Sequence, residues 1–134
     1  MRLVEEVAAI APGESARTTR VAHPDDFYFQ GHFPDQPVVP AVILVELLAQ
    51  TGGLAACSGD QPAPAGGLRL AALGVFKFPA AAAPGDVLEA TARVAGRAGG
   101  LIKIEGEVTA SGRRVAVGSL TLAPAPGGPG EAGS

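Results

Sequence analysis

The segment Ala41–Ala56 constrains the fold more than any other part of the chain, because as a helix it would be apolar around almost its whole circumference. Its strongly polar side chains are Glu46 and Gln50 alone. A helix without a polar face is typical of a buried position. The sequence therefore predicts one central helix from about residue 39 to residue 56. Pro40 suits its first turn, where a missing N–H loses no hydrogen bond.

Glu46 needs a physical reason for its place in this helix. A carboxylate buried without partners is strongly unfavourable, so the group either finds hydrogen-bond donors or retains its proton. A protonated carboxyl at neutral pH can act as a general acid. At about 100° per residue, Glu46, Gln50 and Gly53 lie along nearly one line of the helix. Gly53 has no side chain, so we expect this line to form the floor of a site.

Segments with strand patterns flank the helix. A sheet with one apolar face must cover something, and the central helix is the available partner. Turns rich in glycine, at 98–100 and 111–112, predict antiparallel hairpins. The expected fold class is α+β, an antiparallel sheet wrapped around one long central helix. The predicted strands are 7–11, 15–22, 68–78, 87–94, 101–110 and 113–122, the last four as a meander, with Phe27–Phe29 as a short edge or lining segment.

Length and charge narrow the class of protein. A chain of 134 residues is expected to form one domain, here residues 1–123, and residues 124–134 form a Pro/Gly-rich tail predicted to be disordered. The net charge of −3 gives no support to nucleic-acid binding, which requires a basic face. The longest apolar run contains Glu46, so no membrane span is expected. Acidic residues near the N-terminus do not fit a signal peptide, and the predicted location is the cytoplasm.

Cys57 is the single cysteine of the chain. One thiol cannot form an internal disulfide, and no Cys/His cluster indicates a metal site. At the end of the apolar helix, Cys57 is expected to be a small buried hydrophobe.

His32 lies in a proline-rich loop just before the helix. A neutral imidazole is a competent base, and a desolvated carboxyl such as Glu46 is a competent acid. Free N–H groups at the helix start, around Ala41 and Val42, could stabilise an oxyanion. These three elements are what elimination of water from a 3-hydroxyacyl thioester requires, and the apolar helix surface with 52–53 could border an acyl tunnel. From these residues alone, a hydrogen-bonded pair of His32 and Glu46 that only fixes the loop is an equally good interpretation.

The motif GHFPDQPVVPAV at 31–42, followed by ELLAQ at 46–50, resembles the signature of 3-hydroxyacyl-[acyl-carrier-protein] dehydratases of the FabZ type. The resemblance extends to about residue 123. It implies the hotdog fold and conversion of 3-hydroxyacyl thioesters on acyl carrier protein to trans-2-enoyl thioesters, with no metal or redox cofactor. It also implies that His32 is the catalytic histidine and Glu46 the catalytic acid. Relatives in which dehydration is followed by double-bond isomerisation carry aspartate at that position, so simple dehydration is expected.

The same resemblance implies a homodimer, in some relatives a trimer of dimers, in which the histidine of one subunit faces the acid of another. The residues expected to bind substrate are Phe33, Val38, Ala41, Val42, Gln50 and Gly53, with the carbonyl near Val38 orienting the His32 ring. Two positions depart from the family pattern, which usually has glycine at Ala41 and often at Asp35. An acid at 35 would raise the pKa of His32 if it lay close.

Two alternative functions remain open from the sequence. One is a thioesterase on the same fold, because function belongs to the site rather than to the fold. The other is a non-catalytic acyl-binding or scaffold subunit that needs an active partner, an alternative that the methyl group of Ala41 keeps open.

Overall fold

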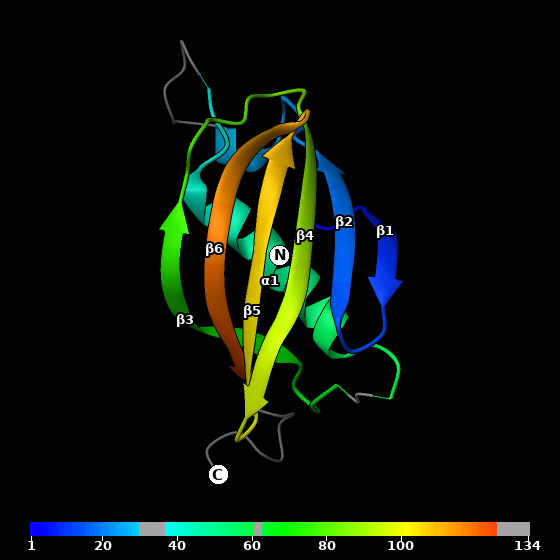
Figure 1. Cartoon of the computed structure of the whole chain (residues 1–134). Coiled ribbons are helices and arrows are strands. Elements are labelled where there is room, and N and C mark those ends of the chain that lie inside the picture. The colour runs from blue at the N-terminus through cyan, green and yellow to red at the C-terminus, as the bar shows by residue number, and fades with distance from the viewer. Residues whose placement is uncertain (30–36, 61–62, 126–134) are drawn as a thin grey trace.

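The computed structural model describes residues 1–29, 37–60 and 63–125. Within these ranges the fold consists of six strands, one long helix and one short 3-10 helix (Figure 1). The helix α1, Ala41–Ala56, lies across one face of the sheet. In chain order the elements are β1 Glu6–Ala11, β2 Ser15–Val21, the 3-10 helix η1 Phe27–Phe29, α1, β3 Leu68–Lys77, β4 Val87–Ala98, β5 Leu101–Ala110 and β6 Arg113–Pro124.

The sheet has the strand order β1-β2-β4-β5-β6-β3, with every neighbouring pair antiparallel. The predicted hairpins β4–β5 and β5–β6 are confirmed. In the second, Ser111 and Gly112 have φ angles of 48° and 86°, the left-handed backbone that a two-residue hairpin turn requires. The prediction that the last four strands form a meander is wrong for β3. β3 pairs with β6 at the far edge, while β4 pairs with β2.

The helix begins at Ala41 rather than at residue 39. The N–H of Val39 is bonded to the carbonyl of Ala82 at 2.8 Å, which holds this residue outside the helix. Pro40 is the N-cap and has an extended backbone. The segment Phe27–Phe29, expected as a short edge or lining segment, is a 3-10 helix whose Tyr28 and Phe29 are buried.

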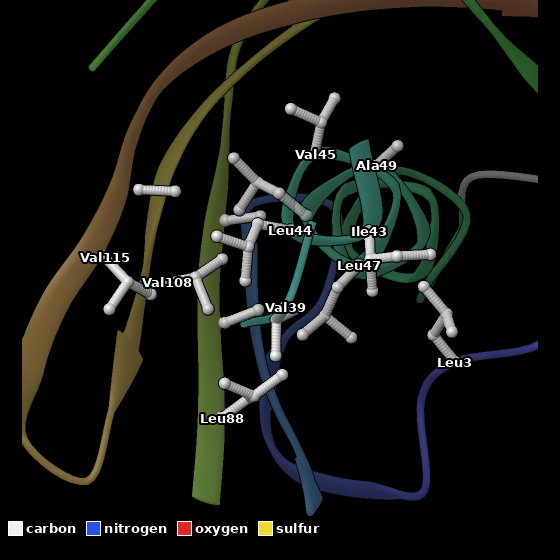
Figure 2. Packing of buried hydrophobic residues seen from close by; sticks show 14 of the residues in the cluster. Leu3, Val39, Ile43, Leu44, Val45, Leu47, Ala49, Leu88, Val108 and Val115 are labelled. Carbon is white, nitrogen blue, oxygen red and sulfur yellow. The ribbon is translucent and has the colours of Figure 1, made fainter. Parts of the chain in front are cut away.

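The core lies between α1 and the sheet. Leu47 and Leu48 are fully buried there, each contributing about 1.5–3 kcal/mol relative to an exposed side chain. Figure 2 shows Leu44 and Leu47 of the helix in one cluster with Leu88 of β4 and Val108 of β5.

The described residues leave one side of α1 uncovered, which corrects the expectation of a helix buried all round. Val42 is 70% exposed and Leu54 is 36% exposed. The helix therefore has two apolar faces, one packed against the protein's own sheet and one facing outward. Of the helices in the described ranges, none is both long and apolar enough to cross a membrane.

At the C-terminal end, β6 continues through Pro124, and the N–H of Ala125 is bonded to the carbonyl of Gly67 at 2.9 Å. The rest of the tail predicted to be disordered lies outside the described residues.

Candidate active site

A groove of ≈ 790 Å³ runs along the partly open side of α1. Glu46, Gln50 and Gly53, the helix residues predicted to lie along one line, form its floor. One turn further along the helix, Cys57 also lines the groove. The N-terminal segment forms one side of the groove, and the start of β3 with the end of β6 forms the other. The helix residues that line it are Glu46, Ala49, Gln50, Gly53, Leu54 and Cys57.

Glu46 faces this groove. Its side chain is half-buried, so it stands at the border of the core and is not embedded in it as the sequence suggested. The Nε2 amide of Gln50, one helical turn further on, donates a hydrogen bond to its Oε1 at 3.2 Å. The carboxyl is thus held at one oxygen by a neutral donor while it borders a largely apolar space. A group placed in this way can exchange a proton with a molecule in the groove.

Gln50 makes three further hydrogen bonds, all to the backbone of the N-terminal segment. Its Oε1 accepts from the N–H of Leu3 at 2.7 Å and from that of Val4 at 3.4 Å. Its Nε2 donates to the carbonyl of Met1 at 2.6 Å. Sequence patterns could not indicate these contacts, because they join positions 46 to 49 residues apart.

The two glycines of the helix do different things. Apart from its chain neighbours and the backbone of its own helix, no atom of the described residues lies within 4 Å of an ideal Cβ on Gly53, so this position leaves open space in the groove. Gly52 was expected to border the same tunnel, but it packs against Ile104 of β5. Cys57 was predicted to be buried, and it is half-buried in the groove wall. Burial raises the pKa of its thiol, which keeps it protonated and a weak nucleophile.

His32 and Phe33 lie outside the described residues, so their predicted roles remain predictions. Among the described residues on either side, Phe29 is buried, and the N–H of Val39 is bonded to the carbonyl of Ala82. Among the other predicted substrate-binding residues, Val38 is half-buried, and Ala41 and Val42 are exposed at the start of α1. No side chain of the described residues caps this helix end.

The sequence did not predict a polar cluster that lies beside the N-terminal segment. Arg20 of β2 donates through Nη2 to Oδ2 of Asp26 at 2.8 Å, and the hydroxyl of Tyr28 donates to the same oxygen at 2.6 Å. Arg20 also donates through Nη1 to the carbonyl of Leu3 at 3.1 Å. The available signal was strand periodicity, since Arg20 falls on the inward face of β2 with Ala16 and Thr18.

This cluster shifts the pKa values of its members. Burial together with the hydrogen bond to Asp26 raises the pKa of Tyr28 to about 12. Burial alone would raise the pKa of Asp26, but the hydrogen bonds from Tyr28 and Arg20 outweigh it and lower that pKa. Asp26 is therefore ionised and Tyr28 neutral at physiological pH, and the cluster fixes the 3-10 helix at 27–29.

An antiparallel sheet wrapped around one central helix defines a protein of the hotdog fold, as predicted. The chain belongs to the family of the FabA-like domain, whose family model matches residues 1–119. It is 34% identical over 122 residues to a 3-hydroxyacyl-[acyl-carrier-protein] dehydratase FabZ of Roseiflexus sp., covering 90% of this chain and 84% of that relative. It is 36% identical over 124 residues to the FabZ of Streptococcus suis, covering 92% and 86%. The chain is therefore a member of the FabA/FabZ-like dehydratase family.

Solved structures share the fold at lower sequence identity. The dehydratase heterocomplex ApeI:P from Xenorhabdus doucetiae has a chain that superposes with a TM-score of 0.77 at 17% identity, covering 98% of this chain and 86% of that one. A hypothetical thioesterase with coenzyme A from Streptococcus pneumoniae superposes with a TM-score of 0.64 at 17% identity, covering 87% and 82%. The same architecture thus occurs in proteins named for different chemistry, so the reaction must be inferred from the site.

Proposed function

We propose that this protein dehydrates 3-hydroxyacyl thioesters, carried on acyl carrier protein, to trans-2-enoyl thioesters. The observation that carries the proposal is the position of Glu46, a half-buried carboxyl at the edge of a long, largely apolar groove. The groove offers apolar surface for an acyl chain, and the carboxyl offers a proton for a leaving hydroxyl. The similarity to FabZ relatives along 90% of the chain supports the same reaction class.

In the proposed reaction, His32 takes a proton from C2 of the substrate. The N–H groups at the start of α1, at Ala41 and Val42, stabilise the negative charge that develops on the thioester oxygen. The double bond forms as the C3–O bond breaks, and Glu46 protonates the departing hydroxyl, which leaves as water. Proton transfer from His32 to the Glu46 carboxylate, directly or through water, restores both groups.

We further propose that a second copy of the chain completes the site. β3 is an edge strand, and its Leu73 and Val75 are 59% and 76% exposed. A long apolar edge strand left open would template aggregation, so pairing with a partner strand is its expected use. In the proposed homodimer, His32 of one subunit faces Glu46 of the other across the groove. Further association into a trimer of dimers is compatible with this arrangement.

The test follows enoyl-thioester absorbance with the purified chain and a 3-hydroxyacyl thioester. Glu46→Gln and His32→Ala are each expected to lose at least about 10²-fold in turnover, the usual contribution of a general acid or base. Glu6→Gln, which neutralises an exposed acid on β1, is the matched control and should retain wild-type turnover. Undiminished turnover in either site variant removes that residue from its role. Release of free thiol would indicate a thioesterase, and turnover only with an added partner would indicate a scaffold subunit.

A further inference from the structure

The first four residues run along α1 as a strap, here called the N-terminal strap and defined as Met1–Val4. Leu3 and Val4 are buried, 2% and 8% exposed, although they belong to no helix or strand. The strap is held to α1 through Gln50, which bonds the carbonyl of Met1 and the N–H groups of Leu3 and Val4. It is held to the sheet through the bond from Arg20 to the carbonyl of Leu3.

The chemistry of these partners fixes which end of the Gln50 amide is oxygen and which is nitrogen. The N–H groups of Leu3 and Val4 both point at one terminal atom of the amide, which must therefore be the acceptor Oε1. The other terminal atom lies beside two acceptors, the carbonyl oxygen of Met1 and Oε1 of Glu46, so it must be the donor Nε2. Both Nε2 protons are used, one by Met1 and one by Glu46. Gln50 borders the groove with both amide protons engaged by the chain, and the substrate-binding role expected from the sequence remains a prediction.

We infer that the N-terminal strap is a positioning element of the active site. The strap fixes the rotamer and the orientation of the Gln50 amide, and the amide presents its remaining proton to Oε1 of Glu46. Because Oε1 accepts this proton, the carboxyl's own proton resides on Oε2 when Glu46 is in its acid form, which is the atom left to meet a substrate hydroxyl. The inference rests on the proposed role of Glu46 as the acid.

Arg20 connects this arrangement to a second segment of the same chain. Its guanidinium bonds both the strap, at Leu3, and Asp26, which in turn accepts a hydrogen bond from Tyr28 in the 3-10 helix. One largely buried cation thus ties the strap beside the proposed acid to the 3-10 helix that precedes the proposed base of the same chain, which in the proposed homodimer serves the other site. A misplacement of about 1 Å at a reacting group can reduce turnover about 10²-fold, so anchors of this kind matter for rate.

The experiment is a double-mutant cycle on the full chain. Gln50→Leu, deletion of residues 2–4, and the two changes together are compared for kcat and KM with a 3-hydroxyacyl thioester. Each single change is expected to reduce kcat at least about tenfold with KM within about twofold, and the double variant should be no worse than the worse single one, because residues acting as one unit are not additive. Additive losses, or a raised KM with unchanged kcat, would overturn the inference. Glu6→Gln is again the control.

A second measurement does not depend on activity or on how the deletion folds. In the wild-type protein with ¹⁵N-labelled glutamine, the side-chain amide of Gln50, assigned by its loss in Gln50→Leu, should exchange its protons with solvent far more slowly than free glutamine. Exchange at the free rate would refute the inference. Full turnover in Glu46→Gln would instead refute the proposed function. An inactive Glu46→Gln combined with an unimpaired Gln50→Leu would refute the strap inference alone.

Discussion

Gly52 of α1 lies so close to Ile104 of β5 that an ideal Cβ on the glycine would be 2.8 Å from Cγ2 of the isoleucine. Around an ideal Cβ on the adjacent Gly53, no described atom outside its own stretch of helix lies within 4 Å. Two neighbouring glycines of one helix thus serve opposite needs. Gly52 lets the helix approach the sheet, and Gly53 leaves space on the groove side.

Alanine at these two positions should therefore give opposite changes in stability. Gly52→Ala overpacks a buried contact and is expected to reduce the free energy of unfolding by about 1–3 kcal/mol. Gly53→Ala adds a methyl group to open space and should raise it, by up to about 1 kcal/mol, because alanine is the better helix former. Urea unfolding followed by far-UV circular dichroism measures both. Equal changes in the two variants would contradict the packing described for Gly52.

A larger side chain at Gly53 should obstruct the groove without disturbing the core. Gly53→Leu is expected to reduce kcat/KM on long-chain 3-hydroxyacyl thioesters more than on short-chain ones, by about tenfold or more, because a few kcal/mol of apolar contact is lost. Gly53→Ala serves as the smaller step in the same series. Equal losses on all chain lengths would show that the acyl chain does not pass Gly53.

The buried hydroxyls of Thr18 and Thr51 offer a second test of the core. The two oxygens are 2.7 Å apart, and the Thr51 hydroxyl donates its one proton to the carbonyl of Leu47 at 2.8 Å. Thr18 must therefore be the donor between them. Thr51→Val leaves the Thr18 donor without its partner and should destabilise the protein by about 1–3 kcal/mol.

The reverse change is expected to be milder, because Thr18→Val leaves only an acceptor of Thr51 idle. The double variant, in which neither hydroxyl remains, should be more stable than Thr51→Val alone. Thermal unfolding of the three variants checks this order. A double variant less stable than Thr51→Val would mean that the unpaired Thr18 hydroxyl is not what destabilises the single variant.

The fold was predictable because its signals are local. Periodicity identified the helix and the strands, and the turn chemistry of Ser111–Gly112 indicated the hairpin. What the sequence did not reveal depends on contacts between distant positions. Pairing of β3 with β6 instead of β4 is one such contact, since nothing in β3 itself specifies its neighbour.

In the candidate site, too, the local geometry was predictable and the contacts between distant residues were not. The line from Glu46 through Gln50 to Gly53 follows from helix geometry and does border the groove. The hydrogen bonds of Gln50 to the N-terminal strap, and the partners of Arg20, could not be predicted, because a backbone N–H carries no sequence signature. For the same reason the sequence did not indicate that the Gln50 amide bonds the chain itself, and its role in substrate binding remains a prediction.

The exposed edge of β3 gives a prediction about assembly. Val75→Glu places a charge on the apolar edge proposed to pair with a second copy, and it should shift the protein toward the monomer in sedimentation velocity and reduce turnover. Leu101→Glu, at an apolar residue that is 48% exposed at the start of β5, is the control and should leave the assembly unchanged. A monomeric wild-type protein with full turnover would show that one chain suffices.

The polar cluster of Arg20, Asp26 and Tyr28 makes the free energy of unfolding fall as the solution becomes more acidic. The pKa of Asp26 is lower in the folded protein than the ordinary value of about 3.9 expected when unfolded. The unfolded state therefore binds more protons over the interval between these values. The stability that Asp26 contributes is fully present above about pH 4 and is lost as the pH falls through its folded pKa.

Asp26→Asn should consequently flatten the fall of the free energy of unfolding between about pH 5 and pH 2, while lowering that free energy at pH 7. The loss at neutral pH follows because the amide cannot replace the nearer charged partner of Arg20, whose largely buried guanidinium would keep only Glu5, at 3.8 Å, as an ion-pair partner. Asp25→Asn, a change at the exposed neighbouring acid, is the matched control and should keep the wild-type slope. Urea unfolding at a series of pH values gives both slopes. If the slope in Asp26→Asn equals that of the wild type, other carboxylates account for the acid sensitivity, and the Arg20–Asp26–Tyr28 cluster does not stabilise the fold through the charge of Asp26.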